Sequence, residues 1–148
     1  MKVSQIMTKD IISIAPEASA QEALSLLDKM KISGLPVLDQ NKKLVGMFTE
    51  KEIIARILPS YVENVGDFKY EENPKSVRLK VLSFVDLKVR EVMRKEVVTV
   101  DEDATLCEVA HIMLMQKARR IPVLNKQKQV VGIASRGDLI KALFSEYR

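Results

Sequence analysis

The sequence predicts a mixed α/β (α+β) fold made of two tandem β-α-β-β-α repeats that pack on each other with pseudo-two-fold symmetry. Three observations predict it. First, residues 2–58 match residues 88–144 without a gap, and about 14 of these 57 positions are identical. Second, short β-branched runs alternate with stretches of helical periodicity in each repeat. Third, a unit of this size makes a poor core by itself, so the two repeats should bury their apolar faces together and form any cleft twice.

The composition excludes several other classes of protein. The chain has 148 residues, 47% hydrophobic and 30% charged, with 5 Gly and 5 Pro, which excludes a disordered or collagen-like chain. No apolar run approaches the roughly 18 residues of a transmembrane helix, so we expect no membrane partner. The N-terminus lacks an apolar signal-peptide segment, and the single cysteine, Cys107, cannot form an internal disulfide. These features predict a cytoplasmic protein.

The same counts argue against an enzyme. One cysteine and one histidine cannot supply the three or four ligands of a zinc site. Cys107 and His111 share one side of a predicted helix, but no third group orients the histidine, so we interpret both as packing or surface residues. The net charge of +4 is spread over interleaved lysines and glutamates, without an aromatic stacking set, which argues against nucleic acid as a partner.

Each repeat contains the same five elements in the same order. β-branched runs predict the first strands, and Ser19 and Thr105, each followed three residues later by glutamate, predict the starts of the first helices. Gly34 is expected to help end the first of these helices. Two strands around a polar turn and a last helix follow. The expected strands and last helices are 11–14, 36–38, 44–48 and 49–58, then 97–100, 122–124, 130–134 and 135–144.

A linker separates the repeats. The predicted organisation is repeat 1 over 1–58, a linker over 59–87 and repeat 2 over 88–148. Residues 61–74 are acidic and lack periodicity, so we predict a loop there. Val77, Val81, Phe84 and Val85 have helical spacing and predict a helix, although Val77, Leu79 and Val81 also alternate as in a strand.

Four paired motifs carry a resemblance to a known family. They are VxxIM and VxxVM at 3–7 and 89–93, IISI and VVTV at 11–14 and 97–100, LPVL and IPVL at 35–38 and 121–124, and VGxxTxxE and VGxxSxxD at 45–52 and 131–138. In this order the chain resembles a stand-alone pair of CBS domains, the module named after cystathionine β-synthase. The resemblance implies a regulatory, ligand-binding protein without catalysis.

The resemblance also implies two equivalent clefts for adenosine derivatives: AMP, ADP, ATP or S-adenosylmethionine, with no cofactor required. In the family the acid of the last motif accepts hydrogen bonds from the ribose hydroxyls, and basic residues before the Pro-Val pair hold phosphate. Carried over by position, the main cleft comprises Ile12, Ile32, Ser33, Arg119, Arg120, Ile133, Ser135 and Asp138. The second, weaker cleft comprises Met47, Thr49, Glu52, Val98, Ala118 and Arg119. It departs from the family pattern because Glu52 replaces the aspartate.

Plainer interpretations of these residues remain open. Thr49 and Glu52 form a complete capping box on their own, and Ser135 and Asp138 would also cap a helix. Arg119 and Arg120 are either solvated charges or phosphate ligands. The alternative function is a structural or interaction module with empty clefts, or a weak nucleic-acid binder.

A second apolar face predicts a homodimer. Leu114 and Met115 stand where the first repeat has Asp28 and Lys29, and Ile112 adds to them. A small monomer rarely exposes such a patch. The alternative is that the linker covers this face through Val81 and Phe84. We also expect a regulated protein partner, which the sequence does not identify.

Overall fold

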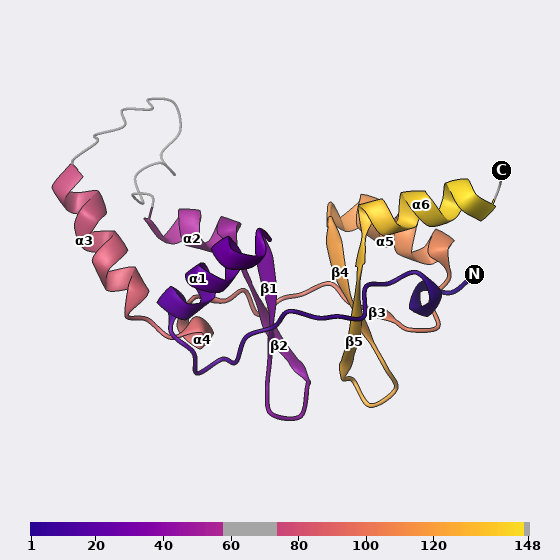
Figure 1. Ribbon diagram of the computed structural model, residues 1–148, viewed down its shortest axis with the longest axis horizontal. Coiled ribbons are helices and arrows are strands. Elements are labelled where there is room, and N and C mark those ends of the chain that lie inside the picture. The colour runs from indigo at the N-terminus through magenta and orange to yellow at the C-terminus, as the bar shows by residue number, and fades with distance from the viewer. Residues whose placement is uncertain (58–73, 147–148) are drawn as a thin grey trace. The chain divides into compact units, whose positions relative to one another are not determined.

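The computed structural model describes residues 1–57 and 74–146, which form the predicted mixed α/β fold of tandem repeats (Figure 1). Most of the loop predicted over 61–74, and Leu58 at the end of a predicted helix, lie outside these residues. The elements are η1 (Val3–Gln5), α1 (Ala20–Met30), β1 (Gly34–Leu38), β2 (Leu44–Thr49), α2 (Glu50–Ile57), α3 (Pro74–Val85), α4 (Val89–Val92), β3 (Val100–Asp101), α5 (Leu106–Gln116), β4 (Arg120–Leu124), β5 (Val130–Ser135) and α6 (Arg136–Glu146).

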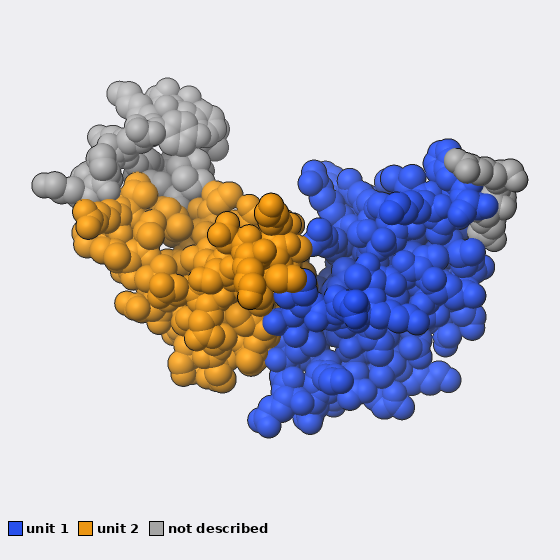
Figure 2. Space-filling view, in the orientation of Figure 1, with its two compact units in different colours: residues 1–13, 38–44, 96–148 blue, residues 14–37, 45–95 orange. Residues whose placement is uncertain are grey.

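The chain divides into two compact units whose boundaries cut across the sequence repeats (Figure 2). Unit 1 contains residues 1–13, 38–44 and 96–148, and unit 2 contains residues 14–37 and 45–95. Each unit therefore joins the body of one repeat to the first residues of the other, and unit 1 also contains residues 38–44 of the first repeat. We call these first residues arm 1 (residues 1–13) and arm 2 (residues 88–95).

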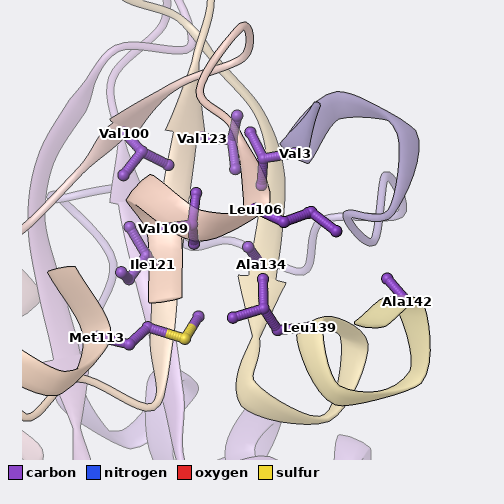
Figure 3. Close-up of a cluster of buried hydrophobic side chains, with 10 residues drawn as sticks. All are labelled: Val3, Val100, Leu106, Val109, Met113, Ile121, Val123, Ala134, Leu139 and Ala142. Carbon is purple, nitrogen blue, oxygen red and sulfur yellow. The ribbon is translucent and has the colours of Figure 1, made fainter. Parts of the chain in front are cut away.

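Unit 1 is built on the three-stranded sheet β3-β4-β5, in which β3 runs parallel to β4 and β5 runs antiparallel to it. Its core gathers apolar side chains from the sheet, α5 and α6, and arm 1 adds Val3 (Figure 3). Val3 is fully buried, and its amide donates to the carbonyl of Ala104 at 2.8 Å. Arm 1 is thus an integral part of the core of unit 1. The core residues are Val3, Val100, Leu106, Val109, Met113, Ile121, Val123, Ala134, Leu139 and Ala142.

Unit 2 packs helices around the strand pair β1-β2. The Phe48 ring from β2 is fully buried, and its centroid lies 6.3 Å from that of Phe84 on α3, so the predicted linker helix is confirmed and packs on the first repeat. Arm 2 supplies α4, whose Val89 is buried and whose Val89 amide donates to the carbonyl of Ala18 at 2.8 Å. Each arm therefore completes the unit formed by the body of the other repeat.

The strand predicted over residues 11–14 is wrong. Only Ile14 pairs, in a parallel bridge with Val37, and the strand predicted over residues 97–100 shortens to Val100–Asp101. The physical reason is the chain's crossing between units, which falls between residues 13 and 14 and again between residues 95 and 96. The run over 11–14 spans such a crossing and so does not pair along its whole length with one sheet, whereas the run over 97–100 lies wholly in unit 1 and its shortening has no explanation in the structure.

Helix ends are the same in both repeats. Ser19 and Thr105 cap α1 and α5 as predicted, each hydroxyl accepting from the amide three residues later. Both helices end on a lysine in the left-handed conformation, Lys31 (φ 54°) and Lys117 (φ 53°). The expectation that Gly34 helps end α1 is therefore wrong. Gly34 instead opens β1, where a Cβ atom would lie 2.9 Å from Thr49 Cγ2.

Two other glycines allow the arms to approach the strands. A Cβ atom on Gly46 would lie 2.6 Å from the Met93 sulfur and 2.8 Å from the Arg94 carbonyl oxygen of arm 2. A Cβ atom on Gly132 would clash with the side chain of Met7 in arm 1. The paired Val-Gly and Met motifs of the sequence are thus the two sides of the same close contact.

We expect Gly46→Ala to destabilise the protein more than Gly132→Ala. The added methyl group at Gly46 meets a backbone carbonyl, which cannot move without breaking the arm's hydrogen bonds, whereas Met7 can change rotamer. Overpacking of this kind costs about 1–3 kcal/mol. Urea unfolding of both variants measures the difference. Equal losses, or a larger loss for Gly132→Ala, would contradict this account of the contact.

Candidate functional site

The first part of the candidate site lies in unit 1, where β5 passes directly into α6. The amide of Ser135 donates to Asp138 Oδ2 at 3.2 Å, and the amide of Asp138 donates to Ser135 Oγ at 3.1 Å. This reciprocal pair is a capping box, so the capping interpretation of both residues is correct. It also fixes the Asp138 carboxylate at the edge of the sheet. Both residues are half-buried.

Arm 1 contributes a further polar group to this carboxylate. Thr8 and Ile133 exchange two backbone hydrogen bonds, both 2.9 Å long, and the Thr8 hydroxyl donates to Asp138 Oδ2 at 3.5 Å. Asp138 Oδ1 has no hydrogen-bond partner and no cation within 4 Å among residues 1–57 and 74–146. One oxygen of the carboxylate therefore keeps its acceptor capacity for a ligand.

Three arginines surround the start of α6 in the same unit. Arg120 lies opposite Ser135 in the β4-β5 pairing, and the Arg119 carbonyl accepts from the amide of Arg136 at 3.0 Å. All three side chains are exposed, and Arg136 Nε donates to the carbonyl of Ala118 at 3.3 Å. Sequence reasoning missed Arg136, although its place directly before Gly137 in the motif was a signal. The backbones of these arginines therefore meet at the start of α6, and the N-terminus of a helix favours anionic ligands.

The second part of the candidate site lies in unit 2, at the start of α2. The amide and the hydroxyl of Thr49 both donate to Glu52 Oε2, the amide at 3.1 Å. Arm 2 places Arg94 against the same side chain, with Nη1 at 3.7 Å from Glu52 Oε1. The Glu52 side chain is only 15% exposed, against 45% for Arg94. Both oxygens of this carboxylate are therefore engaged by protein groups.

The predicted clefts combine residues from both units. Of the main set, Ile12, Arg119, Arg120, Ile133, Ser135 and Asp138 belong to unit 1, and Ile32 and Ser33 belong to unit 2. Of the second set, Met47, Thr49 and Glu52 belong to unit 2, and Val98, Ala118 and Arg119 belong to unit 1. Within each unit the motif residues come together as described, and the full sets stay predictions.

A separate hollow of about 390 Å³ lies in unit 2, against α3. None of the predicted site residues lines it. Its lining residues are Arg56, Leu79, Lys80, Ser83, Phe84 and Leu87. Within the described ranges, no three acidic, histidine or cysteine side chains gather in a way that would hold a metal ion. Nor does any helix there have the length and apolar character needed to cross a membrane.

Comparison with known proteins decides the family. The family model described as the CBS domain matches residues 3–59 and again residues 89–145. The chain belongs to the CBS domain family. The resemblance drawn from the motifs is therefore confirmed, and the chain carries two CBS domains.

Relatives of this chain include both small proteins and larger enzymes. It is 32% identical to the uncharacterized protein MJ1426 of Methanocaldococcus jannaschii, over 97% of this chain and 91% of that protein. It is 28% identical to an inosine-5'-monophosphate dehydrogenase of the same organism, where it spans 95% of this chain but only 23% of the enzyme. That match covers a minor part of the enzyme, so the dehydrogenase activity is not carried over to this chain.

A solved CBS pair has the same fold. The crystal structure of CBSX2 in complex with AMP superposes with a TM-score of 0.76 at 26% identity, covering 99% of this chain and 98% of that one. In that complex AMP is the ligand of CBSX2.

Proposed function

We propose that this CBS pair is a non-catalytic regulatory module that binds an adenosine-containing ligand chiefly through Asp138. The observation that carries the proposal is Oδ1 of the Asp138 carboxylate, which has no protein partner among the described residues and is held in place by the capping box with Ser135. A carboxylate that accepts hydrogen bonds from two vicinal hydroxyls forms charge-assisted bonds, which are the strong ones. Ribose supplies such a pair of hydroxyls.

The cations beside the start of α6 support a phosphate on the same ligand. Arg119 and Arg120 are exposed, and the backbone hydrogen bond between Arg119 and Arg136 holds that segment against the helix. AMP or ATP is the simplest ligand that combines ribose with phosphate, and the AMP complex of CBSX2 supports this class. ADP and S-adenosylmethionine are the other candidates. No Gly-rich loop with a P-loop lysine is present in the sequence, so we expect no hydrolysis.

The bound state would be passed to a regulated protein partner, in the cytoplasm, where the exposed thiol of Cys107 stays reduced. The competing function of weak nucleic-acid binding has a distinct signature. Each phosphate contact releases a counterion, so the affinity for a single-stranded oligonucleotide would fall steeply with salt.

We expect Asp138→Ala to weaken AMP binding roughly ten- to a hundredfold, because hydrogen bonds to a charged group contribute about 1.5–3 kcal/mol. Isothermal titration calorimetry of the wild type and the variant measures this. The variant should stay folded, since a lost helix cap costs only about 0.5–2 kcal/mol.

Glu108→Ala is the matched control. Glu108 holds the same third position in the capping box of α5 but lies outside the predicted site, so its loss should leave AMP binding unchanged. We expect Glu52→Ala to affect binding less than Asp138→Ala. An Asp138→Ala variant with wild-type affinity, or a complete loss of binding in Glu52→Ala alone, would overturn the assignment of the main site.

We further propose that the protein is a homodimer that uses an apolar face on α5 and α6. Leu114 and Met115 on α5 are 77% and 67% exposed, and Ile140 and Phe144 on α6 are 56% and 70% exposed. Ile112, which we predicted to add to this face, instead packs half-buried against the core. The linker helix α3 packs on α1 and α2, and Phe84, one of the two residues that could cover this face, is buried against Phe48 within unit 2.

Replacing this apolar face with the polar residues of the first repeat should give a monomer. The double variant Leu114→Asp/Met115→Lys copies Asp28 and Lys29 from the equivalent helix. Light scattering at tens of micromolar should show a dimer for the wild type and a monomer for the variant. Leu82→Asp, at a 53% exposed position on α3, is the control and should remain dimeric. A monomeric wild type would refute the proposal.

A further inference from the structure

The two repeats place the same backbone arrangement around two carboxylates that face different side chains. In unit 1 the residue of arm 1 that faces the acid is Thr8, and in unit 2 the equivalent residue of arm 2 is Arg94. Thr8 exchanges two backbone hydrogen bonds of 2.9 Å with Ile133, and Arg94 exchanges bonds of 2.8 and 2.9 Å with Met47. The register is identical, so the side chain at this position is what differs.

The two carboxylates differ in which of their oxygens have a protein partner. Asp138 accepts through Oδ2 from Ser135 and Thr8 and leaves Oδ1 without a protein partner among the described residues. Glu52 accepts through Oε2 from Thr49, while Oε1 faces the Arg94 guanidinium at 3.7 Å. This separation is that of an ion pair and not of a hydrogen bond, and it places a positive charge beside the oxygen that would accept from a ribose hydroxyl.

The backbone of Arg94 is held in place beside Glu52. Its backbone is held by both hydrogen bonds to Met47, and Gly46 brings the arm so close that a Cβ atom there would lie 2.8 Å from the Arg94 carbonyl oxygen. The low exposure of Glu52, 15%, reduces the solvent screening of its ion pair with Arg94. A ligand hydroxyl that approaches Glu52 must therefore compete with the Arg94 side chain, which is 45% exposed, for the Oε1 oxygen.

We propose that Arg94 is a specificity-determining residue that closes the Glu52 site to ribose, so that the chain binds one adenosine nucleotide and not two. This inference rests on the proposed function of Asp138 and extends it to the other repeat. Arg94 acts through Glu52, as a positioning residue, by keeping its carboxylate occupied. The duplicated fold thus has one acid, Asp138, with an oxygen that lacks a protein partner among the described residues, and one acid, Glu52, that forms an ion pair with an arginine.

The test exchanges the arm residues between the repeats, with AMP as the probe. Calorimetry of the wild type should give about one AMP per chain, and Arg94→Thr, which copies Thr8, should give two. In an Asp138→Ala background, Arg94→Thr should raise the affinity for AMP roughly ten- to a hundredfold, the effect of one hydrogen bond to a charged acceptor. Thr8→Arg should conversely lose the wild-type site. Arg94→Lys keeps the charge and should keep the Glu52 site closed.

Arg90→Thr is the matched control. Arg90 lies on the same arm, is 53% exposed and forms an ion pair of the same length, 3.7 Å, with Glu17. Its removal changes the net charge equally and should not open a second site. Thermal melts of both variants check that the arm stays docked, since a half-exposed ion pair contributes little to folding.

Each result decides between the proposals. If the wild type binds AMP through Asp138 but Arg94→Thr still binds one, the inference about Arg94 is wrong and the proposed function stands. If Glu52→Asp alone gains a site while Arg94→Thr does not, the length of the acid and not Arg94 sets the specificity. If Arg94→Thr weakens AMP binding, Arg94 is a phosphate ligand. If the wild type binds no AMP while Arg94→Thr binds one, the proposed function of Asp138 fails, and with it the claim of one nucleotide per chain, while the closing of the Glu52 site by Arg94 stands.

Discussion

The structure depends on the close approach of each arm to a glycine in the strand of the other repeat's body. Gly46 and Gly132 leave no room for a Cβ atom beneath Met93 and Met7, and the backbone hydrogen bonds of Arg94 and Thr8 lie at the same contact. This one constraint buries the arm, completes the core with Val3 or Val89, and fixes which side chain faces the acid at the start of the next helix. The contact between the arm and the glycine therefore positions both the core and the candidate site.

Much of the fold could be predicted because the duplicated sequence contains the pattern of each element twice. Periodicity located the helices, and Ser19 and Thr105 located two of their starts. The first strand of each repeat could not be predicted, since β-branched runs report a preference for extended backbone but not the point where the chain leaves one unit for the other. The exchange of the arms is a non-local feature, and it shows in the sequence only as the paired Met and Val-Gly motifs.

The residues of the candidate site also fall into a predictable local group and an unpredictable tertiary group. Ser135 and Asp138, like Thr49 and Glu52, are three residues apart, so their capping geometry follows from local sequence. Thr8 and Arg94 belong to the site through tertiary contact alone, across more than a hundred residues in the case of Thr8 and Asp138. The sequence showed that Glu52 replaces the aspartate of the family pattern in the second, weaker site. The structure adds a positive charge beside it.

Gene duplication first gives two identical sites, and later substitutions can change one site without changing the other. The two repeats differ at both positions of this contact: Glu52 lies 3.7 Å from Arg94 and is only 15% exposed, whereas Asp138 faces Thr8. An ion pair with a half-exposed arginine contributes little to folding, so the stability of unit 2 does not depend on it. The capping box survives in both repeats because it serves the helix whether or not a ligand binds.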